Sequence, residues 1–538
     1  MNYPSLKLNI LTDTHYYSKE NGTSGSAYDF ANSKSQKLLA ESAEVLKTAF
    51  DQIAADKESD ILLISGDVTN NGELNSHAEF ISMLRNFKQK GKRVFVLTAT
   101  HDYREEGFTD GYKGDETYKV PAATRDLLFD MYREFGPDDA IAVHLPSMSY
   151  IVQLCEGYRL FALNDDTNLD NKSGFSDECF EWIADQAKKA IEDNQFIIAM
   201  THHPLIAPSP IYEIIGRGDM LGDYQKRIGQ LADLGIQFIF TGHTHIHNIS
   251  AYQSEQGNVL YDICSSSPIG YPGVIRTAVF MPSQNKVQVD TVYINTPESF
   301  KKDGNDLREV LKKQLVGVTA GMIKTAGEDI DKLAKMVTAI SIKPSLVYKF
   351  GWIIKPVFKI LNSLKIGTVA KWTRRETGLK KSDYADIKNI KVVDFISELF
   401  INLFAGESKY TPDTPQYKIT MGFLNIIDSI LKVLHIDLKK ITKTASSTSE
   451  LVESLLYNPK IDSYKAELNV YSRVKKGESI PQKLEWSKPE PTVRKSKKGL
   501  PIVVCTSVLV IALFPVWIML VLAGFILNKI KFGKKIKQ

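Results

Sequence analysis

Five short apolar runs, each leading into histidine or aspartate, constrain the fold of this chain more than any other feature of its sequence. The runs are Leu8–Leu11, Ile61–Ile64, Val94–Leu97, Phe196–Met200 and Phe238–Phe240. Apolar residues at helical spacing fill much of the sequence between them, at 36–54, 73–89, 177–191 and 223–234. Alternating strands and helices predict an α/β domain with a largely parallel sheet.

A second group of apolar runs follows without long helices between its members. These runs lie at 150–154, 159–163, 259–263, 274–281 and 287–292. Strands joined by short connections favour antiparallel pairing. We therefore expect a second, more antiparallel sheet packed on the first.

The polar residues after the first group of runs form a set that points to metal binding. They are Asp13-Thr14-His15, Gly66-Asp67, Thr100-His101-Asp102, His202-His203 and Gly242-His243-Thr244-His245. Side chains at the carboxyl ends of strands in an open α/β sheet meet in one crevice. Clustered imidazoles and carboxylates are costly unless metal ions satisfy their lone pairs and charge. The sequence therefore predicts a metal site at this edge.

In their order, these motifs resemble those of the calcineurin-like metallophosphoesterase superfamily, D-x-H, G-D, G-N-H-[DE], H and G-H-x-H, over residues 7–292. Within it, Gly66–Glu73 and a helical C-terminal extension make the chain most similar to bacterial class III cyclic-nucleotide phosphodiesterases and related phosphohydrolases. The resemblance implies a four-layer α/β/β/α sandwich. It also implies two divalent metal ions, iron, manganese or zinc, and hydrolysis of a small-molecule phosphoester.

The same resemblance assigns roles by position. It implies a first metal held by Asp13, His15 and His245, a bridging Asp67, and a second metal held by His202, His243 and the residue at the Asn position of the motif, Thr100. A metal-bridging hydroxide is then expected to attack phosphorus. His101 is expected to stabilise the transition state or to protonate the leaving oxygen, with Asp102 orienting it. For His203 and His247 we expect positions outside the ligand set.

One position departs from the family pattern. The chain has Ala99-Thr100-His101 where the family has Gly-Asn-His, so a short hydroxyl replaces the amide oxygen of the second site. Two alternatives stay open: a phosphodiesterase or phosphatase with a weakened second site, and a catalytically impaired membrane scaffold. A lipid-binding or remodelling protein is a third class, which draws on the helical region and the basic tail.

The rest of the chain divides by composition. We predict a phosphoesterase domain at 1–296, an α-helical domain at 297–472, a basic linker rich in Pro and Lys at 473–499, a membrane segment at 500–528 and a basic tail at 529–538. The run from Pro501 to Leu527 contains no charged residue and is long enough to cross a hydrocarbon layer of ~30 Å. The Gly- and Ser-rich stretch 18–35 is expected to be a mobile loop near the site.

Charge supports a membrane partner and argues against nucleic acid. Residues 483–538 carry eleven basic and two acidic residues, which leaves 56 basic and 61 acidic residues in the remainder. A basic tail on a mildly acidic body suits anionic lipid. No signal peptide is recognised, so we expect a cytoplasmic catalytic domain. Basic residues flank both ends of the apolar run and Pro515 lies near its middle. A tilted single span and a re-entrant hairpin therefore both stay open.

Overall fold

The computed structural model describes residues 3–166, 173–210, 217–331, 362–433, 445–457 and 461–479, together with isolated positions between and after these ranges. The predicted membrane segment at 500–528 and the tail at 529–538 lie outside the described residues, as does most of the linker at 473–499. In the part that is described, no helix combines the length and the apolar composition that a membrane span requires.

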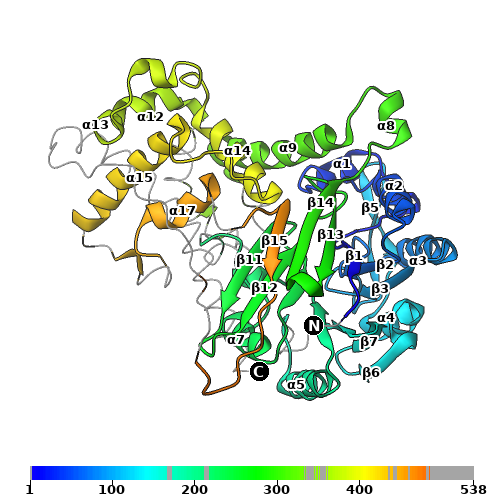
Figure 1. Ribbon diagram of the computed structural model, residues 1–538. Coiled ribbons are helices and arrows are strands. Elements are labelled where there is room, and N and C mark those ends of the chain that lie inside the picture. Colours follow the sequence, from blue (N-terminus) through cyan, green and yellow to red (C-terminus); the bar gives the residue numbers. More distant parts are fainter. Residues whose placement is uncertain are drawn as a thin grey trace, which may run out of the picture.

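Two mixed β-sheets form the centre of the fold (Figure 1). The six-stranded sheet has the order β15-β14-β13-β1-β2-β3, with β1 (Leu6–Leu11), β2 (Ile61–Ser65), β3 (Arg93–Leu97), β13 (Val274–Met281), β14 (Lys286–Tyr293) and β15 (Lys465–Asn469). The seven-stranded sheet has the order β11-β12-β10-β9-β8-β7-β6, with β6 (Ala140–His144), β7 (Ser149–Cys155), β8 (Tyr158–Ala162), β9 (Phe196–Met200), β10 (Phe238–Thr241), β11 (Asn248–Gln253) and β12 (Val259–Cys264). A separate hairpin pairs β4 (Phe108–Lys113) with β5 (Glu116–Pro121).

Aromatic and aliphatic side chains from both sheets form the core between them. Phe280 of β13 contacts Phe196 of β9 and Phe238 of β10, with ring centroids 5.9 and 5.7 Å apart. Leu8 and Ile10 of β1 are buried in the same cluster. Burial of this apolar surface holds the sheets face to face, at roughly 25 cal/mol per Å² removed from water.

Helices cover the two outer faces. The helices that precede β14 are α1 (Ser26–Asn32), α2 (Ser42–Ala55), α3 (Leu74–Gln89), α4 (Arg125–Tyr132), α5 (Asp177–Glu192) and α7 (Tyr224–Asp233), and the short 3₁₀ turns are η1 (Lys19–Asn21), η2 (Arg133–Phe135), η3 (Pro137–Asp139), η4 (Arg217–Asp219) and η5 (Pro282–Gln284). Helices α2 and α3 pack on the six-stranded sheet, and α5 and α7 on the seven-stranded sheet. In α5, Ser176 caps the first turn, and buried residues recur from Cys179 to Ala190 along one face. The α/β part of the prediction is confirmed.

Two sequence-based expectations about these elements are wrong. The later strands do not form a sheet of their own, because β13 pairs antiparallel with β1 while β8 and β12 pair parallel with β9 and β10. Each sheet is therefore mixed. Helix α2 begins at Ser42 rather than at Gln36, because the amide of Leu38 is bonded to the carbonyl of Ile269.

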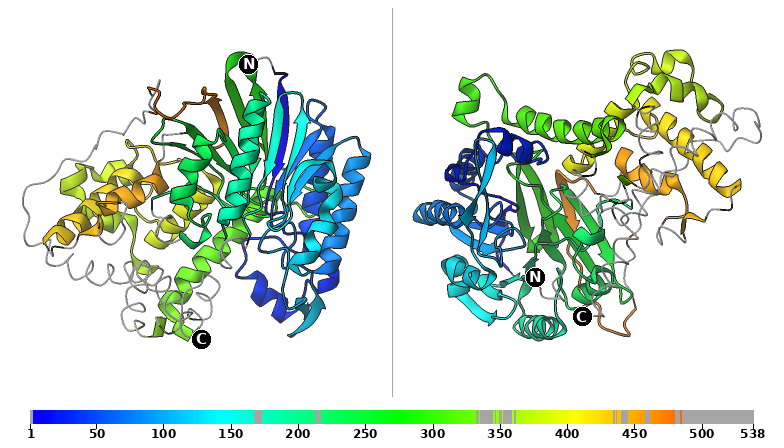
Figure 2. Two further views of the ribbon diagram at one scale, coloured as in Figure 1. Left: turned by 90° about the horizontal axis from the view of Figure 1, so that it is seen from below. Right: turned by 180° about the vertical axis from the view of Figure 1, so that it is seen from behind.

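The region after β14 is helical and has its own small core. It contains α8 (Glu298–Lys302), α9 (Leu307–Glu328), α12 (Ile366–Trp372), α13 (Arg374–Thr377), η7 (Lys381–Tyr384), α14 (Val392–Ala405), α15 (Pro415–Val433) and α17 (Thr448–Leu456). Leu399, Leu424 and Leu456 are buried in that core. Helix α9 reaches from this region toward α1 (Figure 2), and its Leu311 is buried in the core under α2 and α3.

The chain then returns to the six-stranded sheet. The range predicted as helical, 297–472, ends in β15, which pairs antiparallel with β14. Arg276 of β13 is fully buried beside this junction and donates hydrogen bonds to the carbonyls of Ser463 and Cys264, at 2.8 and 2.9 Å. Its other contacts are the Ser265 hydroxyl at 3.1 Å and Nδ1 of His247 at 3.1 Å. A buried guanidinium thus joins the segment that contains Ser463 to the two sheets.

A glycine marks the closest approach of the helical region to the strand-end loops. Gly406 ends α14 with a φ of 67°, and a Cβ built there would lie 1.9 Å from the carbonyl oxygen of His247. The His247 amide also donates to the carbonyl of Phe404, at 2.9 Å. Gly378 ends α13 with a φ of 68° and has open space where a Cβ would stand. Gly378 therefore provides a matched control for a substitution at Gly406.

We expect Gly406→Ala to lower the melting temperature of the purified protein more than Gly378→Ala does. Both substitutions place a side chain in a left-handed backbone, at a cost of roughly 1–2 kcal/mol. Only the first also drives a methyl group into main chain, which adds roughly 1–3 kcal/mol. Equal shifts in thermal unfolding would show that α14 does not press on the loop at His247.

Candidate metal centre

Six buried or half-buried side chains project from the ends of four strands, two in each sheet. Asp13 and His15 follow β1, Asp67 follows β2, His202 follows β9, and His243 and His245 follow β10. The structure groups their ligand atoms into two triads, Asp13–His15–His245 and Asp67–His202–His243, each with all three atoms within 4.8 Å of one another. Each triad takes residues from both sheets.

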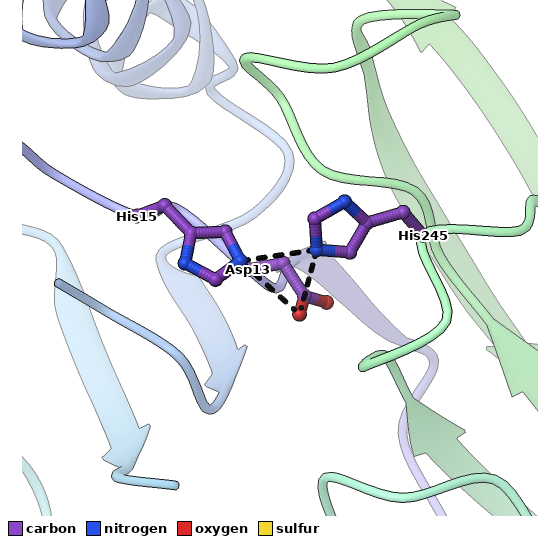
Figure 3. Close-up of side chains that lie close together, drawn as sticks. All are labelled: Asp13, His15 and His245. Atoms are coloured by element: carbon purple, nitrogen blue, oxygen red, sulfur yellow. Dashed lines mark hydrogen bonds and ion pairs between the residues drawn. The ribbon is translucent and has the colours of Figure 1, made fainter. Parts of the chain in front are cut away.

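In the first triad, three candidate metal-ligand atoms point toward one another (Figure 3). Nε2 of His245 lies 3.3 Å from Oδ1 of Asp13, and Nε2 of His15 lies 3.7 Å from the same oxygen. The two Nε2 atoms are 3.0 Å apart. The triad is therefore a compact set of one carboxylate oxygen and two imidazole nitrogens.

The second triad adjoins the first through Asp67. Nε2 of His202 lies 3.2 Å from Oδ2 of Asp67 and 3.3 Å from Nδ1 of His243. The same Asp67 oxygen is 3.8 Å from Nε2 of His15, a member of the first triad. Asp67 thus stands between the two groups, where a carboxylate that bridges two ions is needed.

The backbone at these positions is strained. Positive φ angles occur at five of the six residues, with 51° at Asp13, 40° at His15, 50° at Asp67, 63° at His243 and 56° at His245. Residues other than glycine rarely adopt this conformation, and each instance costs on the order of 1–3 kcal/mol. Strain concentrated on one constellation of side chains is a mark of a functional site.

Main-chain carbonyls fix the orientation of two of the histidines. Nδ1 of His202 lies 2.9 Å from the carbonyl of Ser65, and Nδ1 of His15 lies 3.3 Å from that of Thr69. A ring that donates through Nδ1 presents the lone pair of Nε2 to the centre, which is the usual arrangement of a metal-bound histidine. Facing lone pairs only 3.0 Å apart repel unless a cation lies between them. The donor set therefore fits two divalent metal ions.

Burial and neighbouring charges shift the pKa values of three residues in the centre. Burial lowers the pKa of His15 far below its ordinary value. At His202 burial also lowers the pKa, but the carboxylates of Asp67 and Asp13 raise it, and the net pKa lies well above the ordinary value. At Asp67 burial raises the pKa, but the neighbouring histidines hold it well below its usual range. The Asp67 carboxylate thus stays anionic and attracts positive charge.

His101 lies beside both triads and is oriented by a group that the sequence did not indicate. Its ring meets that of His15 edge to face, with centroids 4.8 Å apart, and its amide donates to Oδ1 of Asp67 at 2.9 Å. Nδ1 of His101 is 2.5 Å from the carbonyl of Asn70. The group bonded to this ring nitrogen is thus the carbonyl of Asn70, and the expectation that Asp102 orients His101 stays a prediction.

Asp102 instead joins two loops. Its Oδ1 accepts hydrogen bonds from the amide and hydroxyl of Thr69, at 2.8 and 3.1 Å, and its Oδ2 accepts one from the amide of Ala99, at 2.8 Å. The carboxylate therefore holds the loop after β2 against the loop after β3.

Other residues near the centre have roles that sequence patterns did not resolve. His203 donates its amide to Asp165 at 2.8 Å, and Nδ1 of His247 accepts a hydrogen bond from Arg276. Gln36 contacts the ring of His245. The stretch 18–35, expected to be a mobile loop, contains η1 and α1 and packs on the hairpin through Tyr28 and Tyr112. Main-chain carbonyls such as that of Asn70 leave no signal in a sequence.

Comparison with known proteins agrees with this geometry. Residues 6–247 match the family model described as calcineurin-like phosphoesterase. No curated protein matches the chain. Among solved structures, the chain is similar to a dimetal phosphatase from Danio rerio, with 11% sequence identity, 54% of this chain and 96% of that chain covered, and a TM-score of 0.39. It is also similar to a 5'-nucleotidase precursor from Thermus thermophilus, with 12% identity, 60% and 59% coverage and a TM-score of 0.30.

The fold and the paired triads define a metal-dependent phosphoester hydrolase with a candidate dinuclear centre of divalent metal ions. Over residues 6–247, which make up less than half of the chain, the sequence is similar to the calcineurin-like phosphoesterase family.

Thr100 stands next to His101, where the family resemblance places an asparagine ligand of the second metal. Its carbonyl accepts a hydrogen bond from Arg104 at 3.3 Å, and the residue is half-buried. A neutral hydroxyl on a short side chain is a weaker ligand for a divalent ion than an amide oxygen on a longer one. We therefore expect the second triad to be the weaker half of the centre.

We expect Thr100→Asn to raise the affinity of metal-free protein for the second of two Mn²⁺ ions, measured by calorimetric titration. An added amide oxygen should tighten this step by about tenfold, the scale of a single ligand or outer contact. Thr100→Ala serves as the control and should leave the step within about twofold of the wild type. An unchanged or weakened second step in Thr100→Asn would mean that the site is completed by another group.

Proposed function

We propose that the protein hydrolyses a small-molecule phosphoester and that its substrates are phosphodiesters of the cyclic-nucleotide class. The observation that carries the first part is the pair of adjoining triads with Asp67 between them. The second part is supported by the similarity of Gly66–Glu73 to the corresponding segment of class III phosphodiesterases. The earlier alternative, an impaired scaffold, is supported by Thr100 alone.

Six side chains of the centre are placed to hold metal ions, and His101 is placed to transfer a proton. Asp13, His15 and His245 would hold one divalent ion, His202 and His243 the other, and Asp67 both. When bound, such a pair of ions acidifies the attacking water and neutralises charge on the phosphoryl oxygens. His101 is held through Nδ1 by the carbonyl of Asn70. Its Nε2 is therefore the atom that exchanges a proton with the substrate.

The decisive variant is Asp67→Asn. An amide keeps the shape of the carboxylate but removes the charge shared by both triads, so we expect hydrolysis to fall by at least about a hundredfold. Activity is measured on cyclic nucleotides, phosphomonoesters and an artificial phosphodiester, each with Fe²⁺, Mn²⁺ or Zn²⁺. Asp51→Asn, which removes an exposed carboxylate paired with Lys47 and Lys90, is the control and should be fully active. Full activity in Asp67→Asn would contradict the two-metal mechanism.

We also propose that the segment 500–528 attaches the protein to a membrane, with the catalytic domain on the cytoplasmic side. The support is the uncharged run from Pro501 to Leu527, with four basic residues at 494–498 before it and five at 529–537 after it. Basic flanks tend to remain in the cytoplasm. Two such flanks favour a segment that enters and leaves on one side, and a tilted single span is the other outcome of the test.

A cysteine placed after Ile536, in a variant that lacks Cys505, reports the position of the tail. A re-entrant hairpin predicts that an impermeant thiol reagent leaves this cysteine unlabelled in intact cells and labels it after lysis, whereas a tilted single span predicts labelling from outside. A second reporter, Lys188→Cys on the exposed face of α5, gives the side of the catalytic domain. Labelling of the tail from outside while Lys188→Cys stays protected would establish a single span and exclude the hairpin.

A further inference from the structure

The terminal amide of Gln36 lies against the outer ring nitrogen of His245. Its Nε2 is 3.1 Å from Nδ1 of His245, whereas Nε2 of the ring faces Asp13 and His15 (Figure 3). The amide oxygen of Gln36, Oε1, is buried and has no hydrogen-bond partner among the described residues. Gln36 is thus the side chain in contact with the back of a triad histidine.

The chemistry of a ligand histidine determines which amide atom belongs at this contact. A neutral imidazole that offers its Nε2 lone pair to a metal carries its proton on Nδ1, and that N–H needs an acceptor. A half-turn of the Gln36 amide exchanges its two terminal atoms and places Oε1 at Nδ1. The exchange gives the unpartnered oxygen a donor and fixes the ring in the ligand tautomer.

The loop that carries Gln36 is held from the helical region. Nε2 of Gln314, on α9, donates to the carbonyl of Ser35 at 2.6 Å and to that of Asn32 at 3.1 Å. On the other side of Gln36, the amide of Leu38 donates to the carbonyl of Ile269 at 2.8 Å. Two anchors therefore fix the backbone of Gln36 on both sides, and one of them belongs to a helix outside the catalytic domain.

We propose that Gln36 is a positioning residue that holds His245 with Nε2 toward the first metal position, and that Gln314 holds Gln36 in place. The proposal rests on the proposed two-metal function and adds to it a connection from the helical region to a metal ligand. That region is then part of the metal centre's support, and its docking sets the affinity of the first triad.

Two substitutions of Gln36 separate orientation from packing. Gln36→Leu keeps nearly the same volume and removes the acceptor, whereas Gln36→Glu keeps an acceptor oxygen. Metal-free protein is titrated with Mn²⁺ in a calorimeter. In Gln36→Leu we expect one of two binding steps to weaken by about 10–100-fold, the range found when a partner of a ligand histidine is lost. In Gln36→Glu both steps should remain within about threefold of the wild type or become tighter.

A substitution in α9 tests the second half of the proposal. Gln314→Met removes the two donated hydrogen bonds and should weaken the same step by less, about twofold to tenfold, because it acts through Gln36. Lys313→Met changes the neighbouring exposed residue and should change nothing. The melting temperature of each metal-free variant is measured in parallel, and we expect it to lie within about 2 °C of the wild type for Gln36→Leu and Gln36→Glu.

The outcomes distinguish failure of this proposal from failure of the function. If the wild type binds fewer than two Mn²⁺ ions, both the two-metal function and the role of Gln36 are contradicted. If the wild type binds two ions and Gln36→Leu binds them equally well, only the role of Gln36 is overturned. The role of Gln36 is also overturned if Gln36→Glu weakens Mn²⁺ binding as much as Gln36→Leu does. If Gln314→Met behaves as the wild type does, the connection to the helical region is overturned.

Discussion

The structure depends on bringing six metal-ligand side chains together at the seam between two sheets. Asp13, His15 and Asp67 come from one sheet, and the three other histidines come from its partner, so neither triad exists until the sheets have packed. The amide of His243 donates to the carboxylate of Asp13 at 2.9 Å, which ties the two strand-end loops directly. Apolar burial between the sheets must therefore offset both the strained backbones and the clustered charges. Ions bound here would reinforce the seam, because each would be held from both sides.

The helical region supports this seam at two points. The end of α14 meets the loop that carries the metal-ligand histidines after β10, through the Phe404 carbonyl and through Gly406 against His247. Helix α9 reaches the loop before α2, where Gln36 stands behind His245. The first contact is made at His247, two residues after His245 in the chain, and the second holds the loop of Gln36, whose side chain contacts His245.

The candidate ligands could be predicted because each is a histidine or aspartate placed directly after an apolar strand. What surrounds them could be predicted less well, for reasons that specific residues make clear. Ser65, Thr69 and Asn70 act through main-chain carbonyls, which any residue type could supply. Gln36 was placed inside a helix because apolar spacing continues across it, whereas a bond from Leu38 to Ile269 keeps the segment extended. The assignment of strands to the two sheets was also predicted wrongly, because β13 pairs with β1, which lies some 270 residues earlier in the chain. Local periodicity carries no information about such distant pairing.

The pairing of β15 with β14 has a consequence for the order in which the protein is made. Lys286 of β14 is opposite Asn469 of β15, and Arg276 is bonded to the carbonyl of Ser463. A ribosome must therefore synthesise the entire helical region before the six-stranded sheet receives its edge strand and the buried guanidinium receives its hydrogen bond to Ser463. During that interval of roughly ten to forty seconds, at 5–20 residues per second, β14 presents an open edge to other nascent chains. Final closure of the catalytic sheet is thus a late event in synthesis, even though nearly all of its strands are among the first residues to emerge.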